Sequence, residues 1–326
     1  MTAPLVSIIT PSYNQAEYLE FSLRSVLEQD YPALEYLVVD GGSQDGSLEI
    51  LQRYAHRLSW WVSEPDRGQA EAINKGFARA RGEFVAWLNS DDLYLPGAVQ
   101  QAVQALQAHP EAGLVFGEAL TIDPAGRPLN RLSFGDWGLE DLMRFRILCQ
   151  PAVFMRRAVL ERAGYLDDSF HFMLDHQLWL RLAREAPLRR VPALWAAARH
   201  HPGAKNLAQA ARFSPETFRV LEWMRAQPGL AAQVAADRRR VEAGAYRLSA
   251  RYLLDAGRYA HSLRHYLAAL RRDPRYALAH WRRMLYALAC LAGARGPAER
   301  FVQGRGARLP DLGGLQGLNA WPGLQV

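Results

Sequence analysis

Two acidic loops, each directly after an apolar segment, carry the residues best suited to chemistry. The segment FVAWLNSDD delivers Asp91 and Asp92, and the segment VVDGGSQDG begins its polar part with Asp40. Two adjacent carboxylates repel each other, so a divalent cation or a ribose diol is their natural partner. The glycines after Asp40 let the backbone come close to a ligand. Both loops are therefore candidates for a site that binds a metal ion or a nucleotide.

The elements that must position these loops alternate between strand and helix patterns. Predicted strands cover residues 6–10, 36–39, 60–62, 83–88, 114–116, 152–155 and 188–191. Predicted helices cover residues 18–27, 48–54, 70–80, 96–108, 139–145 and 175–185, with a hairpin at 123–127. This order predicts an α/β fold with a Rossmann-like, mostly parallel sheet flanked by helices. Ligands bind beyond the carboxyl ends of such strands, so the two acidic loops are expected to share one crevice.

After about residue 210 the strand patterns stop, and a smaller all-α C-terminal region is predicted. Helical spacing over residues 241–291 is broken at 255–257 and 273–274, which predicts a helical hairpin. Its pattern resembles one tetratricopeptide unit, through Gly257, Tyr259, Tyr266, Ala269 and Pro274. The expected domains are therefore an α/β domain at 1–210, a helical appendage at 211–292 and a poorly ordered Gly-rich tail at 293–326.

Composition excludes several classes of protein. With 49% hydrophobic and 22% charged residues among 326, the chain fits a globular protein and neither a disordered nor a fibrous one. No apolar run approaches the roughly 18 residues that cross a bilayer, and the start lacks the features of a signal peptide, so a cytoplasmic location is expected. Cys149 and Cys290 form no CxxC pattern, which argues against a disulfide framework and a cysteine zinc site.

The formal net charge of +6 hides two oppositely charged parts. Residues 201–326 carry 20 Lys and Arg against 8 Asp and Glu, so residues 1–200 carry a net charge of −6. The acidic part suits metal binding, and the Arg-rich part suits phosphates, anionic lipid or nucleic acid. A solvated helix surface rich in arginine is the alternative, because Lys75 and Lys205 are the only lysines of the chain.

Four segments together resemble family 2 glycosyltransferases with the GT-A fold, over about residues 4–206. They are VSIITPSYNQAEYLEFSLRSVLEQDYP, VVDGGSQDGS, SEPDRGQAEAINKGFARARGEFVAWLNSDD and LDHQLWLRLA. The resemblance implies an inverting transfer of a sugar from a nucleotide-sugar donor, assisted by Mg²⁺ or Mn²⁺.

The resemblance also implies which residues bind the donor nucleotide. The loop that lines the nucleotide pocket would contain Pro11, Tyr13 and Asn14. Asp40 corresponds to the residue that hydrogen-bonds a pyrimidine base, and Asp66 lies beside the base and ribose. A UDP-sugar is the favoured donor, and dTDP-sugars remain open.

The metal and the general base follow from the same resemblance. Asp91 would lie nearer the ribose, and Asp92 would hold the metal that bridges the diphosphate. Asp175 matches the carboxylate that acts as general base, although Leu174 and His176 stand where the family more often has an acidic and an aromatic residue. A cation held by Asp92 would stabilise the leaving diphosphate, and one base then suffices for inversion. The alternative role for Asp175 is to cap the helix that it opens.

The segment RHHPGAKN resembles the family's closing loop, in which a His or a basic residue approaches the diphosphate. It offers Arg199, His201 and Lys205 on a loop after the last predicted strand, and the choice between His200 and His201 stays open. Gln150 stands where the family often places an acceptor-side residue. Trp87 and Trp179 are predicted to lie in the core rather than to stack on sugars.

The predicted function is transfer to a saccharide or lipid-linked acceptor in cell-surface glycan assembly. A nucleotidyltransferase would show a basic phosphate loop near the first strand, and none is present; the P-loop pattern is also absent. Two alternatives stay open: a catalytically idle GT-A-like binding or scaffold protein that acts through its basic helical part, and a nucleotidyltransferase. That part is also expected to contact a protein or the inner face of the membrane, and no nucleic-acid partner is expected.

Overall fold

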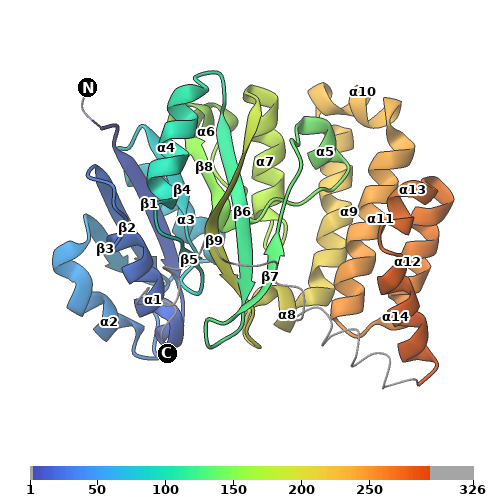
Figure 1. The fold of residues 1–326 in the computed structure, drawn as a ribbon, viewed down its shortest axis with the longest axis horizontal. Helices are drawn as coiled ribbons and strands as arrows, with labels where there is room; N and C mark the ends of the chain where they lie inside the picture. Colours follow the sequence, from blue (N-terminus) through green and yellow to red (C-terminus); the bar gives the residue numbers. More distant parts are fainter. Residues whose placement is uncertain (1–2, 294–326) are drawn as a thin grey trace. The chain divides into compact units, whose positions relative to one another are not determined.

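The computed structural model describes residues 3–293, and these residues form two compact units (Figure 1). Residues 3–138 together with Leu148–His200 form the α/β unit. Leu139–Ile147 together with residues 201–293 form the helical unit. The α/β sheet with its helices and the following helical region are as the sequence predicts. Apart from residue 293, the predicted Gly-rich tail lies outside the described residues.

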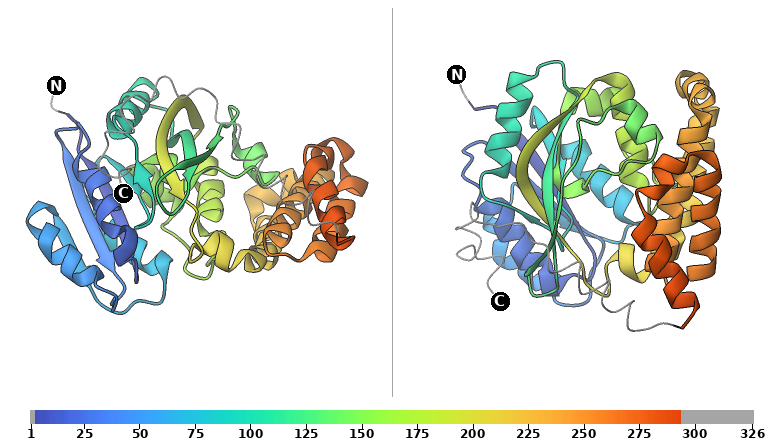
Figure 2. Two further views of the ribbon diagram at one scale, coloured as in Figure 1. Left: turned by 60° about the horizontal axis from the view of Figure 1, so that its bottom comes forward. Right: turned by 45° about the vertical axis from the view of Figure 1, so that its right-hand side comes forward.

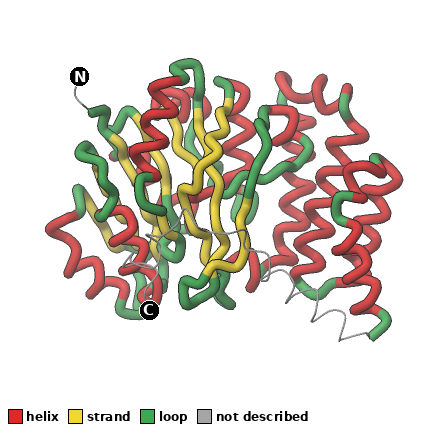
Figure 3. The backbone as a smooth tube through the Cα atoms, viewed as in Figure 1, coloured by secondary structure: helices red, strands yellow, loops and turns green. Residues whose placement is uncertain are grey.

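The α/β unit is built on one sheet in the strand order β3-β2-β1-β4-β8-β6-β9-β5, with β7 paired to β6. The strands of the sheet are drawn in yellow in Figure 3. The strands are β1 (Val6–Ser12), β2 (Leu34–Asp40), β3 (Trp60–Ser63), β4 (Phe84–Trp87), β5 (Leu93–Tyr94), β6 (Leu114–Ile122), β7 (Pro128–Leu132), β8 (Val153–Arg156) and β9 (Leu188–Arg199).

The sheet is mixed, with parallel pairing concentrated in its first half. β3, β2, β1 and β4 run parallel, as expected of strands joined by crossover helices. β8 runs antiparallel to both β4 and β6, whereas β6 and β9 are parallel. The parallel half therefore carries the carboxyl ends at which the acidic loops were expected to meet.

Helices pack on both faces of the sheet, and alternate residues of β1 point to them. Ile8 belongs to the core cluster with residues of α1 (Ala16–Leu27) and α4 (Ala98–Ala108). Ile9 lies on the opposite face against Gly76 of α3 (Gln69–Arg79), where an added Cβ would come within 2.5 Å of the Ile9 side chain. The other helices of this unit are α2 (Ser47–Tyr54), α6 (Arg157–Ala163), α7 (Leu174–Glu185) and two short 3-10 turns, Ala55–Arg57 and Gln150–Ala152.

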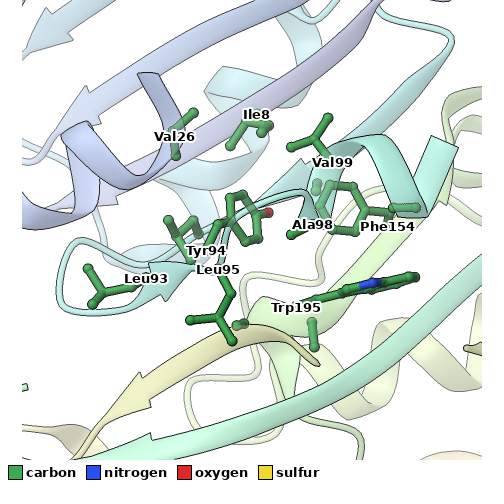
Figure 4. Packing of buried hydrophobic residues seen from close by; sticks show 14 of the residues in the cluster. Ile8, Val26, Leu93, Tyr94, Leu95, Ala98, Val99, Phe154 and Trp195 are labelled. Atoms are coloured by element: carbon green, nitrogen blue, oxygen red, sulfur yellow. The ribbon is translucent and has the colours of Figure 1, made fainter. Parts of the chain in front are cut away.

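The core anchors the chain directly after the acidic pair (Figure 4). Leu93, Tyr94 and Leu95 are almost fully buried. The Tyr94 ring stacks on Phe154 at 5.3 Å, and Phe154 meets Trp195 edge to face at 5.7 Å. The Leu95 amide also donates to the Trp195 carbonyl at 2.7 Å. The Asp91-Asp92 turn is therefore fixed between β4 and a closely packed segment.

Strand β9 differs most from the sequence prediction. It was expected to end near residue 191, but it continues to Arg199. The pairing register between β9 and β6 shifts between Phe116 and Glu118. Pro192 of β9 lies at this shift, and it has no amide hydrogen to donate to a neighbouring strand. The proline lies at a bulge and does not end the strand, so Arg199 is a strand residue and not a loop residue.

The helical unit contains α5 (Leu139–Met143), α8 (Lys205–Ala208), α9 (Ala210–Ala226), α10 (Pro228–Ala236), α11 (Arg238–Asp255), α12 (Tyr259–Arg272), α13 (Pro274–Leu278) and α14 (Trp281–Leu291) (Figure 2). The predicted hairpin is α11 and α12, and Gly257 ends α11 at φ +70°. Gly244 lets α11 pass close to the Arg144 carbonyl, because an added Cβ would lie only 2.0 Å from that oxygen.

Among residues 3–293, no helix has the length and apolar character needed to cross a membrane.

Candidate functional site

The Asp92 carboxylate is held from two directions at the carboxyl end of β4. Its Oδ1 accepts the backbone amide of Arg199 at 3.0 Å, and its Oδ2 accepts Asn89 Nδ2 at 3.1 Å. Its own carbonyl accepts the hydroxyl of Ser22 from α1 at 2.6 Å. Asp92 is 6% exposed, whereas Asp91 beside it is half-buried. One carboxylate is thus fixed, and the other lies nearer the surface.

A chain of side-chain amides connects Asp92 with the first residue of α3 and with the 3-10 turn Gln150–Ala152. Gln69 Nε2 donates to Asn89 Oδ1 at 2.7 Å, and Asn89 Nδ2 donates to Gln150 Oε1 at 3.1 Å as well as to Asp92. Gln150 Nε2 ends the chain on the Trp87 carbonyl at 2.7 Å. Sequence reasoning missed Gln69 and Asn89, although Asn89 stands in the segment that supplied the acidic pair.

The electrostatics of Asp92 favour a cation. Burial raises the pKa of Asp92 well above its usual value, and the negative charge of Asp91 adds to this effect. A cation beside the pair would offset both contributions. In the described part of the chain, no group of three His, Cys, Asp or Glu is arranged to enclose a metal ion. Two carboxylates nevertheless fit Mg²⁺ or Mn²⁺, because Mg²⁺ sites often consist of one or two carboxylates, water and substrate phosphates.

Asp40, at the end of β2, is fully buried and organises its own loop. Its Oδ2 accepts the amides of Gly42 and Ser43 and the hydroxyl of Ser63, at 3.1, 2.9 and 2.7 Å. Its Oδ1 accepts the Ser43 hydroxyl at 2.5 Å. Asp40 is fully buried beneath this set of donors, and its predicted contact with a base stays a prediction.

The loop after β1 is tied to the loop after β2 through Asn14. The Asn14 amide donates to Ser43 Oγ at 2.7 Å, and Asn14 Oδ1 accepts the Gln44 amide at 2.9 Å. Asn14 has φ +50°, which asparagine tolerates better than most residues. Pro11 is buried within β1, whereas Tyr13 is 62% exposed. Of the predicted pocket residues, Tyr13 and Asn14 are therefore accessible to a ligand, and Pro11 is not.

Gly41 leaves room between Tyr13 and Asp66. An added Cβ at Gly41 would lie 2.8 Å from Asp66 Oδ2 and 3.3 Å from Tyr13 Cδ2. Asp66 Oδ1 accepts the Gly68 amide at 2.8 Å, and burial raises the pKa of Asp66, to which nearby Glu71 and Asp40 contribute. The structure thus brings Tyr13, Asp40 and Asp66 together around one glycine.

Asp175 is the second residue of α7, and Oδ1 of its carboxylate accepts the His176 amide at 2.7 Å. The helix is held on the sheet through Trp179, whose ring stacks on Trp87 with centroids 5.2 Å apart. Both tryptophans are 1% exposed, which confirms the prediction that they lie in the core. Trp87 also carries the carbonyl that anchors Gln150. The first turn of α7 is thereby fixed relative to the amide chain.

The three basic residues of the predicted closing loop belong to different parts of the structure. The Arg199 side chain donates to the carbonyls of Asp91, Asp123 and Pro124 at 3.0, 3.3 and 2.8 Å, and its guanidinium lies 4.9 Å from the Tyr18 ring centroid. The Arg199 side chain thus holds three backbone carbonyls, and its predicted contact with the donor stays a prediction. His201 and Lys205 belong to the helical unit, and their predicted approach to the donor stays a prediction.

The sequence of this chain is similar to known glycosyltransferases. Residues 7–162 match the profile described as Glycosyl transferase family 2. A protein of Bacillus subtilis (strain 168), named putative teichuronic acid biosynthesis glycosyltransferase TuaG, is 37% identical over 188 residues, which cover 56% of this chain and 73% of that protein. An uncharacterized glycosyltransferase of Mycobacterium tuberculosis is 37% identical over 189 residues, 56% of this chain and 70% of that protein. One from Rickettsia conorii is 27% identical, and this chain spans only 36% of its length.

Two solved structures share the fold. S. aureus TarS 1-349, solved in complex with UDP-GlcNAc, aligns with a TM-score of 0.58 at 17% identity and covers 92% of both chains. The mannosyltransferase PcManGT from Pyrobaculum calidifontis, in complex with GDP-Man and Mn²⁺, aligns with a TM-score of 0.59 at 23% identity over 94% of this chain and 87% of that one. At these identities the likeness concerns the fold.

Proposed function

Because this chain belongs to glycosyltransferase family 2, we propose that it moves a sugar from a nucleotide-sugar donor to a saccharide or lipid-linked acceptor, with inversion at the anomeric carbon. The observation that carries the proposal is the fixed Asp91-Asp92 turn in the same parallel half-sheet as the loops of Tyr13 and Asp40. The glycan would belong to the cell surface, a choice supported by the name of the B. subtilis relative. The chain would act in the cytoplasm.

The donor nucleotide would bind over the loops after β1 and β2. Tyr13 is exposed beside Gly41, which suits stacking on a base, and Asp66 borders the same space. Asp40 keeps this loop in shape through its four hydrogen bonds, and it would reach the base by exchanging one of them. UDP is the proposed nucleotide; the solved neighbours were bound to UDP-GlcNAc and GDP-Man.

The diphosphate would lie at the Asp91-Asp92 turn. Asp92 would hold Mg²⁺ or Mn²⁺, with Asp91 nearer the ribose, and the ion would supply positive charge to the leaving diphosphate. The chain's own part is to keep Asp92 in one position, through the Arg199 amide and Asn89. Arg199 would act mainly on the turn, because its guanidinium binds the Asp91 carbonyl. His201 and Lys205, from the segment RHHPGAKN, would approach the diphosphate of the bound donor.

The acceptor would be activated by Asp175. Its carboxylate would take the proton of the acceptor hydroxyl, which attacks the anomeric carbon from the side opposite the diphosphate. The stack of Trp179 on Trp87 fixes the helix that carries Asp175. Gln150 would border the acceptor side, where Asn89 couples it to Asp92.

Thermal unfolding against UDP, dTDP, GDP, CMP and ATP, each with and without Mn²⁺, tests the donor site. A ligand at 100 times its dissociation constant stabilises the native state by about 2.7 kcal/mol, which is a readily visible shift in Tm. We expect a shift with UDP that requires Mn²⁺ and is lost in Asp92→Asn. If no nucleotide shifts the Tm and no sugar is transferred to any acceptor of a glycan panel, the proposal fails, and the chain is a scaffold with an idle GT-A fold.

A further inference from the structure

The last helix of the helical unit, α14, presents apolar side chains to solvent along its whole length. Trp281, Leu285, Leu288 and Leu291 are each 50–54% exposed. Their spacing of four, three and three residues places them on one stripe of the helix. Leu278, in the short helix just before, is 51% exposed as well. We call these five residues the α14 stripe.

The opposite side of α14 packs on the rest of the helical unit. Ala287 is fully buried, and the Tyr286 ring meets Tyr259 of α12 at 6.4 Å. A surface helix of a soluble protein normally carries polar residues opposite its packed side. Contiguous exposed apolar residues of this kind mark a surface that another molecule covers. The α14 stripe therefore requires an occupant.

The chain segment that contains α12 and α14 carries mostly positive charge. Between residues 256 and 293 the sequence contains seven arginines and a single acidic residue, Asp273. Among the described residues, Arg258, Arg264, Arg271 and Arg275 are exposed and form no ion pair. Arg282 lies beside the stripe, with its guanidinium 5.3 Å from the Trp281 ring centroid. The molecule that covers the stripe must therefore have an apolar interior for the leucines and a negatively charged surface for the arginines.

We propose that α14 docks this protein on an anionic lipid bilayer, with the α14 stripe in the interfacial layer and the arginines on lipid phosphates. Tryptophan and leucine on one side of a helix with arginine at its edges is the pattern of helices that lie in a membrane surface. Anionic headgroups attract each nearby arginine, and this attraction weakens as salt rises. The surface lies in the helical unit, so the inference stands independently of the proposed transfer.

A second copy of the chain is a poorer occupant than a bilayer. A symmetric dimer through the stripe would bring Arg282 and the neighbouring arginines of both copies towards each other. The acidic residues near the stripe are Asp273 and Asp255, and Asp255 already pairs with Arg283 of α14 at 3.6 Å, so little negative charge is left to offset this repulsion. An anionic bilayer offers acyl chains to the apolar stripe and phosphates to the arginines at the same time.

Vesicle co-sedimentation with the full-length chain tests the proposal. Vesicles of phosphatidylcholine alone and with 30% phosphatidylglycerol are compared at low and at physiological salt. We expect binding to the anionic vesicles only, weaker at physiological salt, and a loss of at least tenfold in L285S/L288S and in R271E/R282E. Matched controls are L207S, which changes another exposed leucine, and R53E/R162E, which makes the same change of net charge in the α/β unit. Thermal unfolding checks that each variant is folded.

Three results would overturn the proposal. The first is no binding to anionic vesicles at either salt concentration. The second is binding of L285S/L288S equal to that of the unaltered chain. The third is a dimer of the unaltered chain in light scattering that L285S/L288S converts to a monomer without any vesicle binding, which would assign the stripe to a second copy.

Discussion

The backbone amide of Arg199 donates a hydrogen bond to Asp92 Oδ1 over 3.0 Å, although 107 residues separate the two in sequence. The bond exists because β9 pairs with the two-residue strand that follows the acidic turn. A backbone donor does not depend on a side-chain rotamer. The orientation of the Asp92 carboxylate is therefore set by the sheet itself.

Replacing Asp92 by asparagine is expected to abolish sugar transfer while the fold persists. The amide oxygen still accepts the Arg199 amide, and loss of a buried charge offsets the weakened contact with Asn89. We expect a Tm within a few degrees of the unaltered chain and at least a 100-fold loss of transfer. Asp136→Asn, at an exposed position, is the control. Transfer at the normal rate in Asp92→Asn would refute the proposed metal role.

Removing the Asn89 side chain should impair transfer more than stability. Asn89→Ala breaks the hydrogen bonds to Gln69, Asp92 and Gln150. The Asp92 carboxylate then keeps only the hydrogen bond from the Arg199 amide. We expect kcat to fall at least tenfold, with a modest drop in Tm. Steady-state kinetics measures this, with the exposed Asn130→Ala as control. An unchanged kcat would show that the amide chain does not position Asp92.

Adding a methyl group at Gly41 should weaken nucleotide binding. The new Cβ would stand 2.8 Å from Asp66 Oδ2 and would push Asp66 or Tyr13 away from the proposed base site. We expect the Mn²⁺-dependent Tm shift with UDP to be lost in Gly41→Ala. Gly138→Ala, where the added Cβ meets nothing within 4 Å, should keep the shift. Equal shifts in both variants would place the nucleotide elsewhere.

Arg199 could hold the backbone or contact the diphosphate. Measurements of unfolding free energy and of UDP binding distinguish the two roles. If it holds backbone, Arg199→Ala leaves three carbonyls without their donor, and the chain should lose about 3 kcal/mol of stability. Urea denaturation of the α/β unit measures this loss. A normal stability combined with weaker UDP binding would instead support the contact with the diphosphate that the sequence predicted.

His280 should make the helical unit sensitive to acid. Burial and the charges of Arg247, Arg283 and Arg251 lower its pKa to about 3, so the folded state keeps the ring neutral while the unfolded state binds a proton below about pH 6.5. The stabilising contribution is complete above pH 6.5 and is lost as the pH falls towards 3, with a slope approaching about 1.4 kcal/mol per pH unit. Denaturation at several pH values should show a flatter profile in His280→Gln. Parallel profiles for the two proteins would contradict the assignment.

Local patterns in the sequence were sufficient to place the acidic residues. An apolar run that ends in Asp91-Asp92 must form a strand with its carboxylates at the carboxyl end, and the same holds for the segment before Asp40. The breaks at Gly257 and Asp273-Pro274 likewise predict the ends of α11 and α12, because these residues end helices by their own backbone preferences. The family resemblance depends on the same segments.

Tertiary structure alone decided how these residues are held. Arg199 is a strand residue because β6 offers β9 a partner beyond Pro192, and no property of residues 192–199 reveals that partner. The amide chain joins Asn89 to Gln69 and Gln150, which lie 20 and 61 residues from it in sequence, so the chain exists only once the sheet has formed. The sequence by itself therefore determined which side chains reach the sheet edge, since strand and helix preferences are local. Their partners depend on long-range pairing, which only the folded chain supplies.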